Sequence, residues 1–107
     1  MASKPEEITE EEVATLTVRI AAEQPDGVAT FDQLRQEVPR RYNLSAVDRA
    51  QSLTRPNESM WEQKIRNIKS HFEAPGNFIY EGYLEHVPDV GYRVTEAGKK
   101  LAKRHAA

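Results

Sequence analysis

Six polar side chains recur between residues 63 and 71 at spacings that bring them to one side of a helix: Gln63, Lys64, Arg66, Asn67, Ser70 and His71. All six carry hydrogen-bond donors of the kind that contact phosphate oxygens and base edges. The other side carries an apolar stripe at i, i+4, i+7 and i+11, formed by Trp61, Ile65, Ile68 and Phe72. Such a helix is anchored in a core by one side and presents the other to a partner. The alternative is an ordinary amphipathic helix whose polar side is solvated.

The same stretch contains a possible catalytic motif, Glu62-Gln63-Lys64, which matches the Glu-x-Lys half of a metal-dependent nuclease site. That chemistry needs the pair on a strand, beside a second carboxylate that helps to hold Mg²⁺. On a helix, Glu62 and Lys64 point about 200° apart. The three histidines have no metal-ligand spacing, and there is no glycine-rich phosphate loop or nucleophile elbow. We therefore expect no catalytic residue, no metal and no cofactor, and we predict that the protein is not an enzyme.

The composition is that of one small domain. The chain has 107 residues, of which 38% are hydrophobic and 30% charged, and this suits a single modest core. No apolar run approaches the roughly 18 residues of a membrane span, and cysteine is absent. We expect a cytoplasmic protein with no membrane contact, in which residues 1–8 form a flexible acidic leader and residues 9–107 a single domain.

Charge is distributed unevenly around a formal net charge of −2. Residues 1–12 hold one lysine and five glutamates, whereas residues 40–72 hold seven basic and three acidic side chains. Residues 93–105 hold five basic side chains and one acidic side chain. Basic patches on an acidic body permit binding to DNA at one surface while limiting non-specific adhesion, although chance clustering gives the same pattern.

Local signals predict four elements before the polar helix. Thr9 and Glu12 form a capping box that opens a helix ending near residue 24. Residues 28–30 are extended, and Thr30 caps a second helix over residues 31–38, which Pro39 ends. A short helix then begins at Ser45 and runs toward residue 52.

The polar helix itself is expected over residues 58–72. Asn57 or Ser59 caps its first turn. Residues 73–77 break the helix, and residues 78–80 form either a last helical turn or an extended piece, so the conformation of residues 73–82 is left open. Beyond them, residues 83–87 and 91–95 alternate as two strands around a compact hairpin loop at 88–91, and Thr95 caps a final helix over residues 96–104.

The order helix, strand, helix, helix and two-stranded hairpin predicts an α+β fold of the winged helix-turn-helix type. Three segments carry a closer resemblance: Trp61 to Ile68, Gly82-Tyr83-Leu84-Glu85, and Gly91 to Gly98. Together they resemble the N-terminal winged-helix domain of Mrr-type restriction endonucleases and related small bacterial proteins. The chain departs from that pattern by an insertion at 73–80, by Asp89 in the wing, and by lacking the nuclease half.

The resemblance implies that the protein binds double-stranded DNA through a recognition helix at about 58–72 in the major groove, in a regulatory or restriction-associated role. Basic side chains near helix starts would meet phosphates, and polar ones on the helix would face bases. The expected contacts are Arg40, Arg41, Arg55, Asn57, Ser59, Gln63, Lys64, Asn67, Ser70 and His71. The alternative is a winged helix that binds a protein partner or forms a homodimer without binding DNA, with the apolar residues 78–80 as a contact patch or as part of the core.

Overall fold

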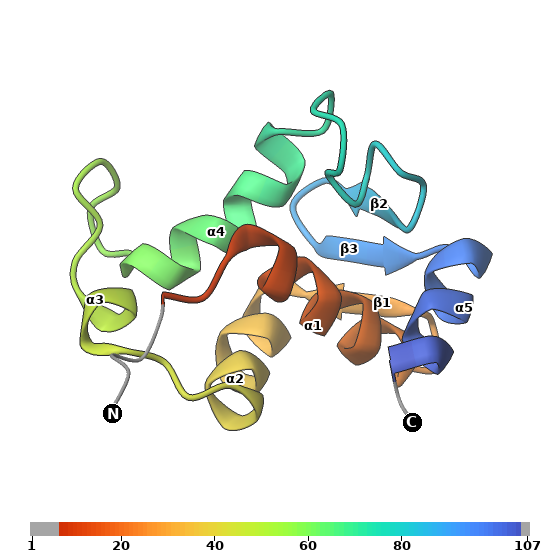
Figure 1. Cartoon of the computed structure of the whole chain (residues 1–107), viewed down its shortest axis with the longest axis horizontal. Coiled ribbons are helices and arrows are strands. Elements are labelled where there is room, and N and C mark those ends of the chain that lie inside the picture. The colour runs from red at the N-terminus through yellow and green to blue at the C-terminus, as the bar shows by residue number, and fades with distance from the viewer. Residues whose placement is uncertain (1–6, 106–107) are drawn as a thin grey trace, which may run out of the picture.

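The computed structural model describes residues 7–105 as an α+β fold (Figure 1). In chain order its elements are α1 (Glu10–Ala22), β1 (Val28–Thr30), α2 (Phe31–Arg41), α3 (Ala46–Arg49), α4 (Met60–Ser70), β2 (Leu84–Val87), β3 (Gly91–Val94) and α5 (Glu96–His105). The predicted α+β class and the order of the elements are confirmed. No helix among these residues is long and apolar enough to cross a membrane.

The three strands form one antiparallel sheet in the order β1-β3-β2. The first residue of β3, Gly91, lies opposite both Thr30 on β1 and Val87 on β2. A Cβ atom on Gly91 would lie 2.0 Å from the carbonyl oxygen of Ala29, so only glycine permits this approach of β1 to β3.

The core lies where α1 crosses the middle of the molecule and meets the sheet and the other helices (Figure 1). Tyr92 on β3 is fully buried there, with its ring edge-on to Phe31 at a centroid distance of 5.6 Å. Its hydroxyl donates to the carbonyl oxygen of Ile65 (2.6 Å) and accepts from the amide of Lys69 (3.1 Å). One buried side chain therefore joins the sheet to the backbone of α4.

Capping boxes begin the first three helices. Thr9 and Glu12 exchange two side chain–backbone hydrogen bonds at 2.9 and 3.0 Å, as predicted, and Thr30 with Gln33 repeats the arrangement for α2. Ser45 begins α3 in the same way, but that helix ends at Arg49 rather than continuing toward residue 52. The chain turns away there because residues 50–59 form a hairpin of their own.

Two other boundaries differ from the prediction. Pro39 lies inside α2: it costs the helix one backbone hydrogen bond, but the helix continues through it and closes with the amide of Tyr42 donating to the carbonyl of Val38 (2.9 Å). Helix α4 ends at Ser70, where the Asn77 side chain donates to the carbonyl of Ile68 (2.9 Å). The Phe72 side chain, expected in the core, is therefore past the helix and 51% exposed.

The leader expected over residues 1–8 does not extend to Ile8, whose side chain is completely buried. Both carboxylate oxygens of the buried Asp48 accept a hydrogen bond from the amide of Ile8 (3.1 and 3.3 Å). Residues 1–6 lie outside the described part of the chain.

Residues 73–82, for which the sequence left two alternatives, adopt neither a helix nor a strand. The Asn77 side chain is buried and accepts hydrogen bonds from the amides of Ile79 (2.8 Å) and Tyr80 (3.2 Å). Phe78 completes the core against Tyr83, whereas Tyr80 is 56% exposed. The apolar residues of this segment thus serve mainly as core.

Candidate nucleic-acid interface

Helix α4 has the two-sided character that the sequence predicts. Trp61, Ile65 and Ile68 are buried and fix the helix on the core. Ser59 precedes the helix, and both its amide (2.9 Å) and its hydroxyl (2.8 Å) donate to the carboxylate of Glu62. Asn57 instead occupies a turn with a φ of 64°. Of the two alternatives for the start of the helix, the structure selects Ser59.

Two of the six donors on α4 are directed to the N-terminal part of the chain. The amine of Lys64 donates to the carbonyl of Ile8 and lies 3.9 Å from the Glu7 carboxylate, so that its side chain is only 20% exposed. Nδ1 of His71 is 2.8 Å from a carboxylate oxygen of Glu10 in α1. Both side chains hold the edge of α4 against neighbouring segments rather than extending outward.

Two more donors on α4 contact residues 50–59. The guanidinium of Arg66 pairs with the carboxylate of Glu58, and this hydrogen bond raises the pKa of Arg66. The side-chain oxygen of Gln63 accepts from the hydroxyl of Ser52 (2.7 Å), which leaves the NH₂ group of Gln63 available. The polar side of α4 is thus partly occupied by the chain that precedes it.

Three polar residues on the last turns of α4 are accessible to a partner. Within residues 7–105, the side chains of Asn67 and Lys69 have no hydrogen bond or ion pair. Ser70 is exposed, and its hydroxyl donates to the carbonyl of Arg66 (3.2 Å). Asn67 and Lys69 point about 200° apart on the helix, so they lie on opposite flanks of its outer side, with Ser70 between them. These three are the residues of α4 best placed to bind a partner.

The three arginines expected near α4 are dispersed. Arg40 and Arg41 lie in the last turn of α2, so their predicted position at a helix start is wrong. Arg41 is bound to Glu23 at 2.6 and 2.9 Å and to Glu37 at 3.2 Å; the bond to Glu23 raises the pKa of Arg41 and lowers that of Glu23. Arg55 is exposed near α4 and has no side-chain partner among the described residues.

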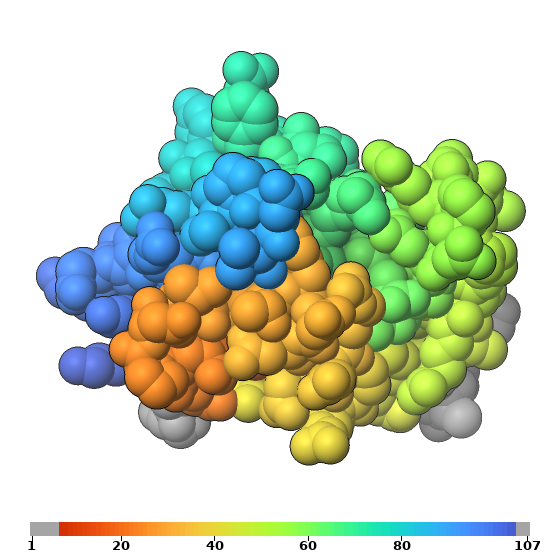
Figure 2. All heavy atoms as spheres, turned by 180° about the vertical axis from the view of Figure 1, so that it is seen from behind, coloured from red at the N-terminus to blue at the C-terminus, as the bar shows by residue number. Residues whose placement is uncertain are grey.

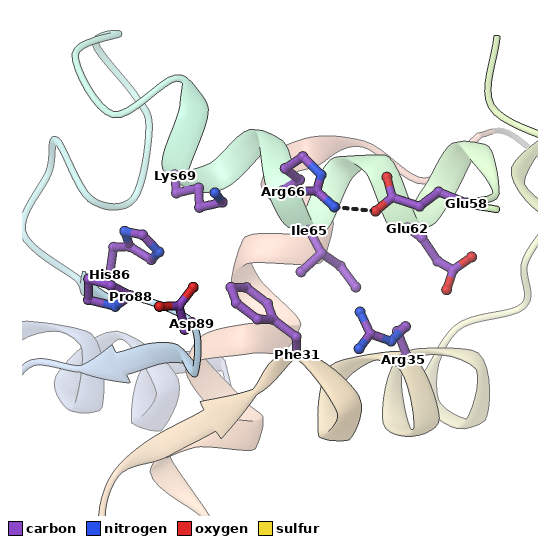
Figure 3. Close-up of a pocket in the computed structure, with 10 residues that line it drawn as sticks. All are labelled: Phe31, Arg35, Glu58, Glu62, Ile65, Arg66, Lys69, His86, Pro88 and Asp89. Atoms are coloured by element: carbon purple, nitrogen blue, oxygen red, sulfur yellow. Dashed lines mark hydrogen bonds and ion pairs between the residues drawn. The ribbon is translucent and has the colours of Figure 1, made fainter. Parts of the chain in front are cut away.

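A hollow of about 350 Å³ lies between α4, the first turns of α2 and the β2–β3 hairpin (Figure 3). Figure 3 shows Arg35 reaching toward α4 from one side, with Lys69 and His86 on the other side. The hollow also contains acidic groups, among them Glu62 and Asp89. It therefore presents charges of both signs to a partner.

The contact residues predicted from the sequence did not include Arg35, Lys69 or His86. The only feature that could have indicated His86 as a site residue is its position opposite Tyr92 in the hairpin, where the two rings are 5.9 Å apart. Burial lowers the pKa of His86, and the nearby cation Lys69 lowers it further, whereas Asp89 opposes both effects. His86 is therefore less readily protonated than an ordinary histidine.

The Glu62–Lys64 pair does not converge on one site. Glu62 accepts from Ser59 and lines the hollow, whereas Lys64 bonds to Ile8 on another flank of α4. Among residues 7–105 there is no group of three or more His, Cys, Asp or Glu side chains that is placed to hold a metal ion.

Comparison of the chain with protein-family models, with curated proteins and with solved structures finds no significant match.

Proposed function

We propose that this protein is a winged-helix protein that binds double-stranded DNA, with α4 as the recognition helix and the β2–β3 hairpin as a wing. The observation that carries the proposal is the relative position of three elements. One flank of α4, on which Lys69 lies, surrounds one hollow together with the first turns of α2 and the hairpin loop (Figures 2 and 3). A winged helix uses this arrangement when its recognition helix enters the major groove and the neighbouring elements meet the backbone.

The proposed contacts form a smaller set than the sequence indicates. Asn67 is the candidate for base recognition, since its amide can bond adenine through two atoms. Lys69 and Arg55 are cations with no ion-pair partner in the described part of the chain, and such side chains bind phosphate without giving up an existing ion pair. Ser70 and the free NH₂ group of Gln63 complete the surface. Lys64, His71, Arg40 and Arg41 are excluded, because each is already bonded elsewhere in the protein.

An amide-shift NMR titration with a random-sequence pool of DNA duplexes tests this proposal. We expect shifts in α4 and in residues 50–59, and a weaker response from α5. Asn67→Ala and Lys69→Ala should each weaken binding about 5-fold or more, since a lost base or phosphate contact has an effect of this size.

Lys100→Ala supplies the matched control, because Lys100 is an exposed cation on α5 without a partner among the described residues. It should leave the affinity unchanged. The absence of shifts at about 50 mM salt, where phosphate contacts are strongest, would rule the proposal out.

The second candidate function is contact with a protein partner. The observation that favours it is the engagement of Lys64, Arg66 and His71 in bonds within the chain, which removes donors from the polar side of α4. Under this alternative the exposed aromatic side chains of Phe72 and Tyr80 would form the contact. Binding would then tolerate high salt, and Phe72→Ala would abolish it.

A further inference from the structure

The segment between α3 and α4, residues 50–59, forms an ordered hairpin that we call the arm. The amide of Met60 donates to the carbonyl of Ala50 (2.8 Å), and the amide of Ser52 donates to the carbonyl of Glu58 (2.8 Å). Gln51 and Ser59 pair between these two bonds as an antiparallel bridge. Only a turn at Pro56 and Asn57 was predicted for this segment.

Two side chains inside the arm fix its tip. The amide group of Gln51 donates to the carbonyls of Arg55 (2.7 Å) and Glu58 (3.0 Å). The hydroxyl of Ser52 accepts from the amides of Thr54 (3.2 Å) and Arg55 (3.1 Å). A tip held in this way loses little conformational entropy when it binds a partner.

Two side chains of the tip, Leu53 and Arg55, are exposed to solvent. Leu53 is 92% exposed, the highest exposure among the large hydrophobic side chains of the described residues. Arg55 is exposed and has no partner within residues 7–105. The tip thus combines a rigid backbone with one apolar and one cationic side chain, both available to a partner.

The arm stands beside the outer side of α4, at its first turns. Its base is attached to that side twice, through Ser52 to Gln63 and through Glu58 to Arg66. In Figure 1 its tip projects beyond the start of α4, at the end of that helix opposite the β2–β3 hairpin. A duplex that contacts the open residues at the other end of α4 therefore extends past the arm.

We propose that the arm is a second wing, whose Arg55 and Leu53 enter the minor groove next to the major groove contacted by α4. The inference rests on the DNA-binding function proposed above. Arginine suits the minor groove because the groove concentrates negative potential where it is narrow. An apolar side chain such as leucine packs there against sugars and base steps. The first wing is poorly equipped for this contact, since its loop carries Asp89.

The test uses a chemical change that is confined to the minor groove. Guanine carries its N2 amino group in the minor groove, and inosine lacks that group while presenting the same major-groove edge. Two duplexes are compared by fluorescence anisotropy at low salt, one of alternating guanine and cytosine and one of alternating inosine and cytosine. The wild-type protein should bind the inosine duplex about 5-fold more tightly, because the obstructing amino group is gone.

Variants assign this preference to the arm. The double variant Leu53→Ala/Arg55→Ala should bind both duplexes equally, whereas Lys69→Ala, which removes a phosphate contact common to both, should bind both more weakly and keep the preference. Both arm positions are exposed, so the substitutions leave the core intact; an unchanged amide spectrum outside the arm checks this.

The outcomes separate the two proposals. If the wild-type protein binds both duplexes equally, or if the double variant keeps the preference, the second wing is wrong while DNA binding stands. If the wild-type protein binds neither duplex, the proposed function itself is wrong, and the second wing with it.

Discussion

At the scale of single residues, the Tyr92 hydroxyl makes two bonds to the backbone of α4 that a phenylalanine would lose. It donates to the carbonyl of Ile65 and accepts from the amide of Lys69, two residues that are hydrogen-bonding partners in a regular helix. We expect Tyr92→Phe to lower the free energy of unfolding by about 1–2 kcal/mol near neutral pH, as measured by chemical denaturation. The cost stays moderate because the amide and the carbonyl can bond to each other.

The pH dependence of that difference tests the environment of the same hydroxyl. Burial raises the pKa of Tyr92 above its ordinary value near 10, despite the opposing bond from Lys69. The protonated form is therefore favoured in the folded state. The stability that the protonated hydroxyl contributes to the folded protein is complete below pH 10, and it decreases as the pH rises toward the folded-state pKa. Between about pH 8 and about pH 11 the advantage of tyrosine over phenylalanine should fall by about 1.4 kcal/mol. The other three tyrosines, Tyr42, Tyr80 and Tyr83, are present in both proteins and cancel; a constant difference would contradict the prediction.

Asp48 is a second residue on which distant parts of the chain depend. Its buried carboxylate accepts from the amides of Ser45 (2.9 Å) and Ile8, which lie on different segments. Asp48→Ala leaves both amides without a partner, so we expect a loss of about 2–4 kcal/mol in the free energy of unfolding. Asp32→Ala is the control, because its ion pair with Arg35 is at the surface and should be worth less than about 1 kcal/mol. Equal losses in the two variants would contradict this role of Asp48.

At the scale of elements, the docking of α5 depends on one glycine. A Cβ atom on Gly98 would lie 2.3 Å from the carbonyl oxygen of Tyr83 and 2.7 Å from a Val94 methyl group. Helix propensity alone predicts that Gly98→Ala stabilises the protein by about 1 kcal/mol, whereas the steric conflict predicts a loss of about 1–3 kcal/mol. We expect the loss, seen as a lower denaturation midpoint. Ala97→Gly at the adjacent exposed position measures the propensity effect by itself, and a gain in Gly98→Ala would show that the contact is loose.

The elements that the sequence predicted correctly are those specified by neighbouring residues. The Thr9 capping box, the apolar stripe from Trp61 to Ile68 and the alternation in β2 and β3 each act within a few positions. The site was harder to predict because its side chains are bonded to distant ones. Lys64 contacts a residue 56 positions away, and His71 contacts one 61 positions away. No local spacing indicates such a contact, and so two donors on α4 were assigned outward although the fold uses them.

The structure of the arm was also not predicted in full, although its contacts join residues that are close in the sequence. Pro56 and Asn57 correctly indicate a turn, but the hairpin depends on two side chains, Gln51 and Ser52, which bond to backbone groups of the tip. Such bonds follow from three-dimensional placement, and residue type alone does not predict them. The same placement exposes Leu53, which hydrophobicity alone would assign to the core.

At the scale of the whole molecule, the proposed surface carries few free charges on a chain with a net charge of −2. Near α4 and the arm, the cations with no partner among residues 7–105 are Arg49, Arg55 and Lys69. A second group, which includes Lys100 and Lys103, is on α5 at the other end of the molecule from the arm (Figure 1). If DNA binds at α4, only the first group releases counterions.

The salt dependence of binding therefore reports which end of the molecule contacts DNA. About three phosphate contacts predict a slope near −3 for the logarithm of the association constant against the logarithm of salt concentration, a loss of about 40-fold between 50 and 200 mM. Arg55→Ala should reduce the steepness by about one unit, whereas Lys100→Ala/Lys103→Ala should leave it unchanged. A slope near −6 that falls with the α5 double variant would assign the contact to the other end, and a slope near zero would favour a protein partner. Because one salt titration series distinguishes these three slopes, it decides both which end of the protein contacts the duplex and whether DNA is the partner at all.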